Sequence, residues 1–543
     1  MKWFTRGNWQ WLVICLVFML VITGCNSNET STDVKKDGEA TKGDKSISIG
    51  ITRSPASFNP LDRADWSQFY ISSVMFNPLM EMDEDFNFIP RLADSIETTD
   101  NQTFTAKLNP NAKWTDGKPV TADDVLFSLE MLTNPKFSSL LTSQFQILEG
   151  LAKGGKFEGG SFADFSGAKK VDEHTIIFKT QTPVDPNVFK EKIAANLKAL
   201  PKHVLGNVSP ETLQQNPFMQ KPTVTYGAYK FVEFQNNQYV ALEANKGYFK
   251  GAPKVNKLFF KIMPVANLVA QFQNGDIDMN FPDIGSLSLQ DYETVKKMNH
   301  IKTEDGAPVN YKLVGFNTKS LDEKVRQAIA YGINREGMVK DLLKGAGEVS
   351  TGPYAPVHPY YNEDIKNDYP YNPEKAKELL KEAGWDSSKT VNYIVPIGNQ
   401  ELEKAGDLIA ANLKEVGINV QVQKSDIPGM IQKLKKGEFD MYSITFSFVL
   451  DPDVSFVYQS GASNNFTYWS NSEVDDLLGK GLRETEQSAR KELYDKFQGL
   501  HVKELPEIGL YADYRLRAVN KRVTVGGPKD IGMLINVHEW DVK

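Results

Sequence analysis

One stretch of the chain, from Val391 to Gln423, constrains the fold more than any other. Two short apolar segments, VNYIVPIG and INVQVQ, flank a helical pattern from about Glu401 to Val416, and Gly417 ends that helix. A strand, a crossover and a second strand within so few residues place the two strands parallel in one sheet. The stretch therefore predicts an α/β fold.

Cap and turn signals predict further elements around this unit. In YNPEKAKELLKEAGW, Asn372 supplies the helix cap and Pro373 takes the first helical position. Thr121 and Asp124 form a capping-box-like start to an earlier helix, which is expected to run to the Asn-Pro pair at 134–135. SISIGITRS alternates apolar and polar residues, which predicts an opening strand.

Two distant segments share one spacing. QFQNGDIDMNF contains Gly275 and Asp278, and KLKKGEFDMYS contains Gly437 and Asp440 at the same positions, each aspartate being followed by a methionine. In both, a helix is expected to end at the glycine before a strand, which is a common arrangement in unrelated proteins. The alternative is an internal symmetry with two similar lobes, and a cleft between lobes is a natural place for a small molecule.

The N-terminus has the three-part plan of a secretory signal. Lys2 and Arg6 are its only charges, and an uncharged run follows from Trp11 to Gly24. A membrane-spanning helix is the alternative, but a span needs about 20 apolar residues and this run is shorter. We therefore expect residues 1–24 to be a signal peptide.

The tetrapeptide ITGC, which ends at Cys25, resembles the lipobox of bacterial lipoproteins. The resemblance implies cleavage before Cys25 and a lipid anchor on its thiol, with about two to three acyl chains because a single chain holds only marginally. Residues 25–45 would then form a lipid-bearing linker that is too polar to order itself. Cys15 would leave with the signal, so the mature chain would have no thiol for a disulfide, a zinc site or catalysis.

Charge and motif content argue against nucleic-acid binding and against catalysis. The formal net charge is -7, whereas neutralising phosphates requires a basic face. No two histidines have the spacing of a zinc-binding helix, and no Gly-x-Ser-x-Gly elbow is present. GLAKGGKF has P-loop spacing, but Phe157 stands where a hydroxyl group must reach magnesium. We expect no catalytic residue, no metal site, no cofactor and no nucleic-acid partner.

An ordered set of motifs runs from about Ile49 to Val525 and comprises LNPNAKWTDGKPVTADDVLFSLEML, LKALPKHVLGNV, YGAYKFVEF, LEANKGYFKGAPKV, AQFQNGDIDM, GFNTKSLDEKVRQAIAYGINREGMV, YNPEKAKELLKEAGW and YWSNSEVDDLL. This set resembles the oligopeptide-binding family, the solute-binding lipoproteins of bacterial peptide and nickel ABC importers. The order of the motifs makes the resemblance more specific than any one of them.

The resemblance implies an α/β, two-lobed periplasmic-binding-protein-like fold of the class II type, with a satellite domain and a hinged ligand cleft. The first domain would combine residues 46–78, 205–305 and 505–543. The satellite domain would span residues 79–204, and the second lobe residues 306–504.

The resemblance also implies the function. The chain would be a receptor rather than an enzyme, anchored by lipid to the outer face of the cell membrane, monomeric, and able to pass oligopeptides to an ABC permease. The same fold could instead bind a nickel chelate, an opine, an oligosaccharide or a signalling peptide. A secreted hydrolase or an adhesion lipoprotein is an alternative of a different class.

A receptor for mixed peptides must bind the main chain, which all peptides share, so the ligand is expected to lie extended against strand-like backbone. By matching to the family, the candidate ligand-binding residues are Trp66, Tyr311, Thr445, Phe446, Ser447, Phe448, Asp451, Asp453 and Tyr511. For the aromatic residues, ordinary core packing is the alternative.

One position departs from the family. Well-studied oligopeptide binders hold the peptide amine with an aspartate, and in this chain Phe448 takes that place. A buried ammonium group without a countercharge is costly. Either Asp451 or Asp453 takes the role, or the amine is recognised elsewhere or not at all.

Overall fold

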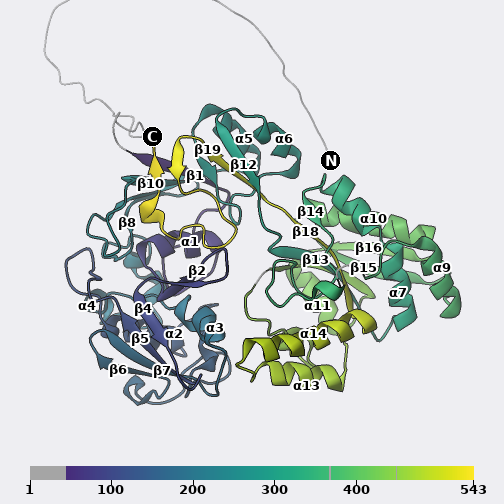
Figure 1. The fold of residues 1–543 in the computed structure, drawn as a ribbon, viewed down its shortest axis with the longest axis horizontal. Helices are drawn as coiled ribbons and strands as arrows, with labels where there is room; N and C mark the ends of the chain where they lie inside the picture. The colour runs from purple at the N-terminus through teal and green to yellow at the C-terminus, as the bar shows by residue number, and fades with distance from the viewer. Residues whose placement is uncertain (1–44, 366–367, 448) are drawn as a thin grey trace, which may run out of the picture. The chain divides into compact units, whose positions relative to one another are not determined.

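Two large sheets organise the chain in the computed structural model, which describes residues 45–365, 368–447 and 449–543 (Figure 1). The first sheet has the strand order β12 (Ile301–Asp305), β19 (Leu516–Asn520), β11 (Met279–Asn280), β1 (Ser46–Ile51), β10 (Lys257–Ile262), β9 (Tyr239–Ala244) and β8 (Tyr229–Gln235). Helices α5 (Val265–Asn274) and α6 (Tyr292–Lys296) pack on this sheet, and together they form what we call the first lobe. The opening strand is confirmed as β1.

The second sheet has the strand order β14 (Gly347–Glu348), β18 (Glu507–Asp513), β13 (Asn310–Phe316), β17 (Met441–Ser447), β15 (Thr390–Pro396) and β16 (Asn419–Ser425). Helices α7 (Glu323–Gly332), α9 (Pro373–Glu382) and α10 (Gln400–Glu415) cover one face, and α11 (Ile427–Lys436) packs on the other. Helices α12 (Ser455–Tyr458), α13 (Ser472–Gly481) and α14 (Gln487–Glu504) share a further core. We call this assembly the second lobe.

The predicted strand, crossover and strand are confirmed in the second sheet. Strands β15 and β16 are parallel, with Val391 opposite Val420, and α10 connects them. The apolar face of α10, which includes Leu402, Ile409 and Leu413, is buried against the sheet. Burying that face is the main source of stability for such a crossover, because an isolated helix of this length is marginal in water.

A third sheet of four strands forms a separate unit. Its order is β4 (Ala93–Glu97), β5 (Thr103–Leu108), β7 (Thr175–Lys179) and β6 (Ala168–Asp172). With α2 (Ala122–Thr133), α3 (Pro186–Phe189) and the turn η3 (Lys190–Ala194), it forms what we call the satellite. The capping box is confirmed at the start of α2, where the Asp124 carboxylate accepts a hydrogen bond from the Thr121 amide at 3.0 Å.

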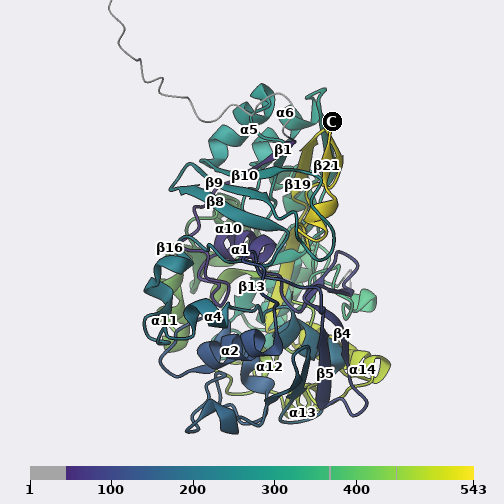
Figure 2. The ribbon, with the colours of Figure 1, turned by 90° about the vertical axis from the view of Figure 1, so that its left-hand side faces the viewer.

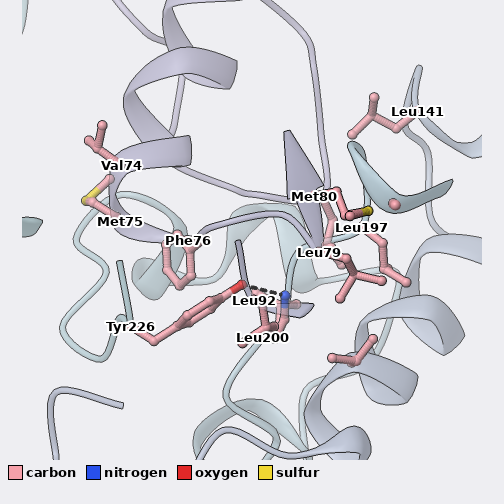
Figure 3. Close-up of a cluster of buried hydrophobic side chains, with 14 of the residues drawn as sticks. Val74, Met75, Phe76, Leu79, Met80, Leu92, Leu141, Leu197, Leu200 and Tyr226 are labelled. Carbon is pink, nitrogen blue, oxygen red and sulfur yellow. Dashed lines mark hydrogen bonds between the residues drawn. The ribbon is translucent and has the colours of Figure 1, made fainter. Parts of the chain in front are cut away.

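The satellite shares one hydrophobic core with the first lobe. Helix α1 (Trp66–Met75) lies between the first and third sheets in both views (Figures 1 and 2). Figure 3 shows the junction, where Phe76 and Tyr226 pack among apolar side chains from both units. The Tyr226 hydroxyl accepts a hydrogen bond from the Ala199 amide at 3.0 Å. The second lobe has its own cores, which makes it the separate partner of the other two units.

The chain passes between the two lobes at two short crossings. Residues 306–309 join β12 to β13, and residues 514–515 join β18 to β19. Asp530 holds the first crossing, since its carboxylate accepts a hydrogen bond from the Ala307 amide at 2.8 Å. Two adjacent crossings of this kind are typical of a hinge between lobes.

The repeated Gly-Asp-Met spacing corresponds to a repeated structure. Helices α5 and α11 end at Gly275 and Gly437, which have left-handed φ values of 74° and 72°. The next strand then docks parallel to β1 in one lobe and to β15 in the other. The Asp278 carboxylate accepts from the Ser48 amide at 2.8 Å, and the Asp440 carboxylate accepts from the Asn392 amide at the same distance. The two lobes therefore share a local building unit, as the symmetry hypothesis expects.

Candidate ligand-binding site

The carboxyl ends of the parallel strands in the second lobe lie together near the crossings. Strands β15, β16 and β17 end at Pro396, Ser425 and Ser447, and Ser447 pairs with Asn310 at the start of β13. Ligands of open α/β sheets bind at such an edge. This edge is therefore the candidate site on the second lobe.

The expected residues of β17 divide between surface and core. Thr445 and Ser447 are exposed, whereas Phe446 is half-buried. The Phe446 ring stacks on Tyr311 with a centroid distance of 5.8 Å, and the Tyr311 hydroxyl donates to the Pro353 carbonyl at 2.7 Å. Tyr311 is thus a buried support, and the exposed polar groups are the ones available to a ligand.

Tyr511 is also buried, beneath a charged group of the second lobe. Lys312 is only 4 % exposed and forms an ion pair with Asp513. Burial raises the pKa of Tyr511, and the Glu401 carboxylate adds to that shift. Burial also raises the Asp513 pKa, but the Lys312 charge outweighs this and leaves the pKa below its ordinary value.

An aromatic wall leads from the first lobe toward the second crossing. Trp66 is the first residue of α1, 44 % exposed, and stacks on Tyr70 at 5.6 Å. The Arg63 guanidinium lies 5.0 Å from the Trp66 ring centroid. The Tyr70 hydroxyl donates to Asp283, which forms an ion pair with Arg515 in the crossing. Of the expected aromatics that the structure describes, Trp66 is the most exposed.

The two expected aspartates have partners within the protein. The Asp451 carboxylate binds the Arg490 guanidinium at 2.7 Å and the Lys192 ammonium at 2.9 Å. Asp453 is half-buried and accepts a hydrogen bond from the Ser455 amide at 2.9 Å. Asp451 is therefore neutralised by two cations and is not a free countercharge for a peptide amine. Phe448 and Cys25 lie outside the described residues.

Sequence reasoning missed the charged groups at the base of the site. Lys312, Asp513 and Glu401 come from three separate segments, Asp283 follows β11 in the first lobe, and Arg515 lies in the second crossing. One signal was available: NYKLVGF is an otherwise apolar strand, and a lone lysine in such a strand indicates a buried ion pair.

The described residues contain neither a metal-binding group nor a helix that could cross a membrane. Histidine, cysteine, aspartate and glutamate side chains form no group of three that could hold a metal ion within residues 45–365, 368–447 and 449–543. In the same ranges, every helix is too short or too polar to cross a membrane.

Comparisons with known proteins agree with this architecture. The profile of the bacterial extracellular solute-binding proteins, family 5 Middle, matches residues 87–468. The oligopeptide-binding protein AppA of Bacillus subtilis (strain 168) is 28% identical over 513 residues, which are 89% of this chain and 90% of that protein. The dipeptide-binding protein of Escherichia coli (strain K12) is 26% identical over 474 residues, which are 82% of this chain and 85% of the relative.

A solved structure extends the similarity to three dimensions. The oligopeptide-binding protein AppA from Bacillus subtilis in complex with a nonapeptide superimposes with a TM-score of 0.73 and 26% identity. The match covers 92% of this chain and 99% of that chain. The two-lobed periplasmic-binding-protein fold expected from the sequence is therefore confirmed.

Proposed function

Since the chain belongs to family 5 of the bacterial extracellular solute-binding proteins of ABC importers, we propose that it is a lipid-anchored receptor that captures oligopeptides and delivers them to a membrane permease. The observation that carries the peptide assignment is the similarity, over nearly the whole chain, to proteins named for oligopeptide and dipeptide binding. The domain division proposed is residues 46–78, 205–305 and 505–543 for the first domain, 79–204 for the satellite domain and 306–504 for the second lobe.

The chemistry of the strand edge favours a ligand with a regular polar backbone. Exposed Thr445 and Ser447 alternate with half-buried Phe446, so this end of β17 offers main-chain groups beside an apolar surface. Each main-chain hydrogen bond contributes roughly 0.5 to 1.5 kcal/mol, so about six to eight of them suit micromolar affinity after ordering costs. Receptors of this kind work as monomers, and we expect the same state here.

Mass spectrometry of what co-purifies with the protein tests this function. Protein expressed from residue 26 onward, without the signal and the lipidated cysteine, is expected to carry a mixture of peptides. Recovery of only a metal chelate or a sugar would remove the peptide assignment. Turnover of a chromogenic protease or glycosidase substrate by the pure protein would overturn the receptor assignment altogether.

Replacing Trp66 tests the aromatic wall. Trp66→Ala removes an exposed ring that we place against the ligand, and the affinity for a co-purifying peptide is expected to fall by about 1.5 kcal/mol, roughly tenfold. Isothermal titration measures the change. Trp66→Phe should recover much of the loss, and Leu140→Ala, which removes an exposed apolar side chain from the satellite, should leave affinity unchanged. Equal affinities for Trp66→Ala and the native protein would exclude Trp66 from the site.

Fractionation of cells tests the lipid anchor. Cys25→Ala is expected to move the full-length protein from the membrane fraction into the soluble fraction or the medium, because acyl chains hold it through burial of their methylenes. Peptide affinity should not change. Cys15→Ala is the matched control and should leave the protein on the membrane; persistent anchoring of Cys25→Ala would contradict the proposal.

A further inference from the structure

A half-buried glutamate of the satellite, Glu191, contacts the backbone of the second lobe. Glu191, in the turn η3, directs both carboxylate oxygens at the backbone amides of Leu450 and Asp451. One oxygen accepts a hydrogen bond from the Leu450 amide and the other from the Asp451 amide, each at 2.7 Å. Two hydrogen bonds from one carboxyl group to consecutive amides fix the direction of that backbone.

Ion pairs surround these two hydrogen bonds and also cross the interface. Lys192 of the satellite binds the Asp451 carboxylate at 2.9 Å, and Arg490 of the second lobe lies 3.6 Å from Asp185 of the satellite. Arg490 is itself held in place, since it binds Asp451 at 2.7 Å and donates to the Gly481 carbonyl at 2.9 Å. Each of the two ion pairs therefore joins the satellite to the second lobe: Lys192 pairs with Asp451, and Asp185 pairs with Arg490.

These contacts lie between two parts of the protein that are connected to each other through the first lobe. The satellite is joined to the first lobe by a shared core, whereas the second lobe is joined to the first by the crossings at 306–309 and 514–515. Contacts between satellite and second lobe must therefore form or break as the lobes close or open. They also fix the backbone at Leu450 and Asp451, in the same part of the chain as Thr445 and Ser447, the exposed groups at the candidate site.

We propose that Glu191 is a positioning residue, which latches the satellite onto the second lobe and holds the backbone at Leu450 and Asp451 in its ligand-binding conformation. The proposal rests on the proposed function, because the latch is expected to slow the release of a bound peptide. Glu191 does not touch the peptide in this scheme; it acts through the Leu450 and Asp451 amides.

The charges around Glu191 give the latch a pH dependence. The charged and titratable groups around Glu191 are Asp185, Lys190 and Lys192 from the satellite, and His358, Tyr360, Asp451, Asp453, Arg490 and Lys491 from the second lobe. Burial raises the pKa of Glu191 to about 7, and the nearby Asp451 charge adds to the shift. Burial lowers the pKa of His358 to about 4, so this ring stays neutral above pH 5.

The sign of the effect follows from the direction of the Glu191 shift. In the open state Glu191 would titrate near its ordinary value of 4.5, so closing raises its pKa and takes up a proton between about pH 5 and pH 7. The latch is therefore strongest near pH 5 and weakens as the pH rises through 7. Burial raises the Asp185 pKa as well, which acts in the same direction.

Amide exchange tests the latch without any ligand. In the native protein the Leu450 and Asp451 amides should exchange slowly, and Glu191→Ala should speed them at least tenfold while the unfolding temperature stays nearly constant. Glu191→Gln keeps one acceptor oxygen but does not titrate, so these amides should show intermediate protection. After correction for the intrinsic exchange rates, that protection should not vary between pH 5.5 and 8. Equal protection in all three proteins would overturn the latch.

Peptide release provides the second measurement, with a pool of random synthetic peptides as the probe. Dissociation from the native protein should quicken roughly tenfold between pH 5.5 and pH 8. Glu191→Gln should abolish that dependence, and Glu158→Gln, an exposed glutamate of the satellite region, should retain it. If the native protein binds none of the pool, the proposed function is wrong, and the exchange rates at Leu450 and Asp451 alone decide whether the latch exists.

Discussion

Lys312→Ala is expected to lower the free energy of unfolding by about 3 to 5 kcal/mol. Lys312 lies on the central strand β13, is 4 % exposed and neutralises Asp513. Its removal leaves the half-buried Asp513 carboxylate without this partner, beside Glu401, an acid whose pKa burial raises. A buried charge without a partner costs far more than the pair itself contributes, so the loss should greatly exceed that of a surface ion pair.

Urea unfolding followed by circular dichroism measures this loss. Lys324→Ala is the matched control, because Lys324 pairs with Glu382 at 2.8 Å on the exposed surface and its loss should cost less than about 1 kcal/mol. The double variant Lys312→Met with Asp513→Leu removes both charges and should recover most of the stability. A Lys312→Ala protein as stable as Lys324→Ala would show that the pair is not buried.

Trp114→Ala is expected to destabilise the protein by a similar amount, about 3 to 5 kcal/mol, for a different reason. The Trp114 side chain is 1 % exposed, packs edge-on against Tyr226 at 4.9 Å and donates its indole N–H to Asp124 at 3.3 Å. The substitution creates a cavity at the junction of the satellite with the first lobe and removes a donor from the carboxylate that caps α2.

The same substitution at an exposed tryptophan isolates the effect of burial. Trp66→Ala should change the free energy of unfolding by less than about 1 kcal/mol, since nearly half of that side chain already faces solvent. Denaturant unfolding of the two variants side by side gives the comparison. A small loss at Trp114 would mean that the junction can collapse around the missing ring.

Elements set by local chemistry were predictable from the sequence. The Thr121 and Asp124 capping box, the Asn372 cap and the strand-helix-strand unit after Val391 each depend on residues close together in the chain, and the structure contains all three. The repeated Gly-Asp-Met segments were predictable for the same reason, although their matching hydrogen bonds to Ser48 and Asn392 required the sheets to be seen.

Features made by distant residues were not predictable. Glu191 meets Leu450 across 259 positions, and no local pattern links the two. Tyr311 and Tyr511 matched ligand-lining positions of the family, but the structure buries both, because large rings on central strands fill the cores on either face of the sheet. Asp451 has the right charge to bind a peptide amine, but in the structure its carboxylate is already paired with Lys192 and Arg490.

The shared core between the satellite and the first lobe limits how this protein can move. Although the chain builds three sheets, the packing around Phe76 and Tyr226 joins two of them into one rigid block. Large-amplitude motion between this block and the second lobe is then expected as rotation about the paired crossings. Under the proposed function, a permease would then need to distinguish only two geometries, one loaded and one empty, whatever sequence the bound peptide has.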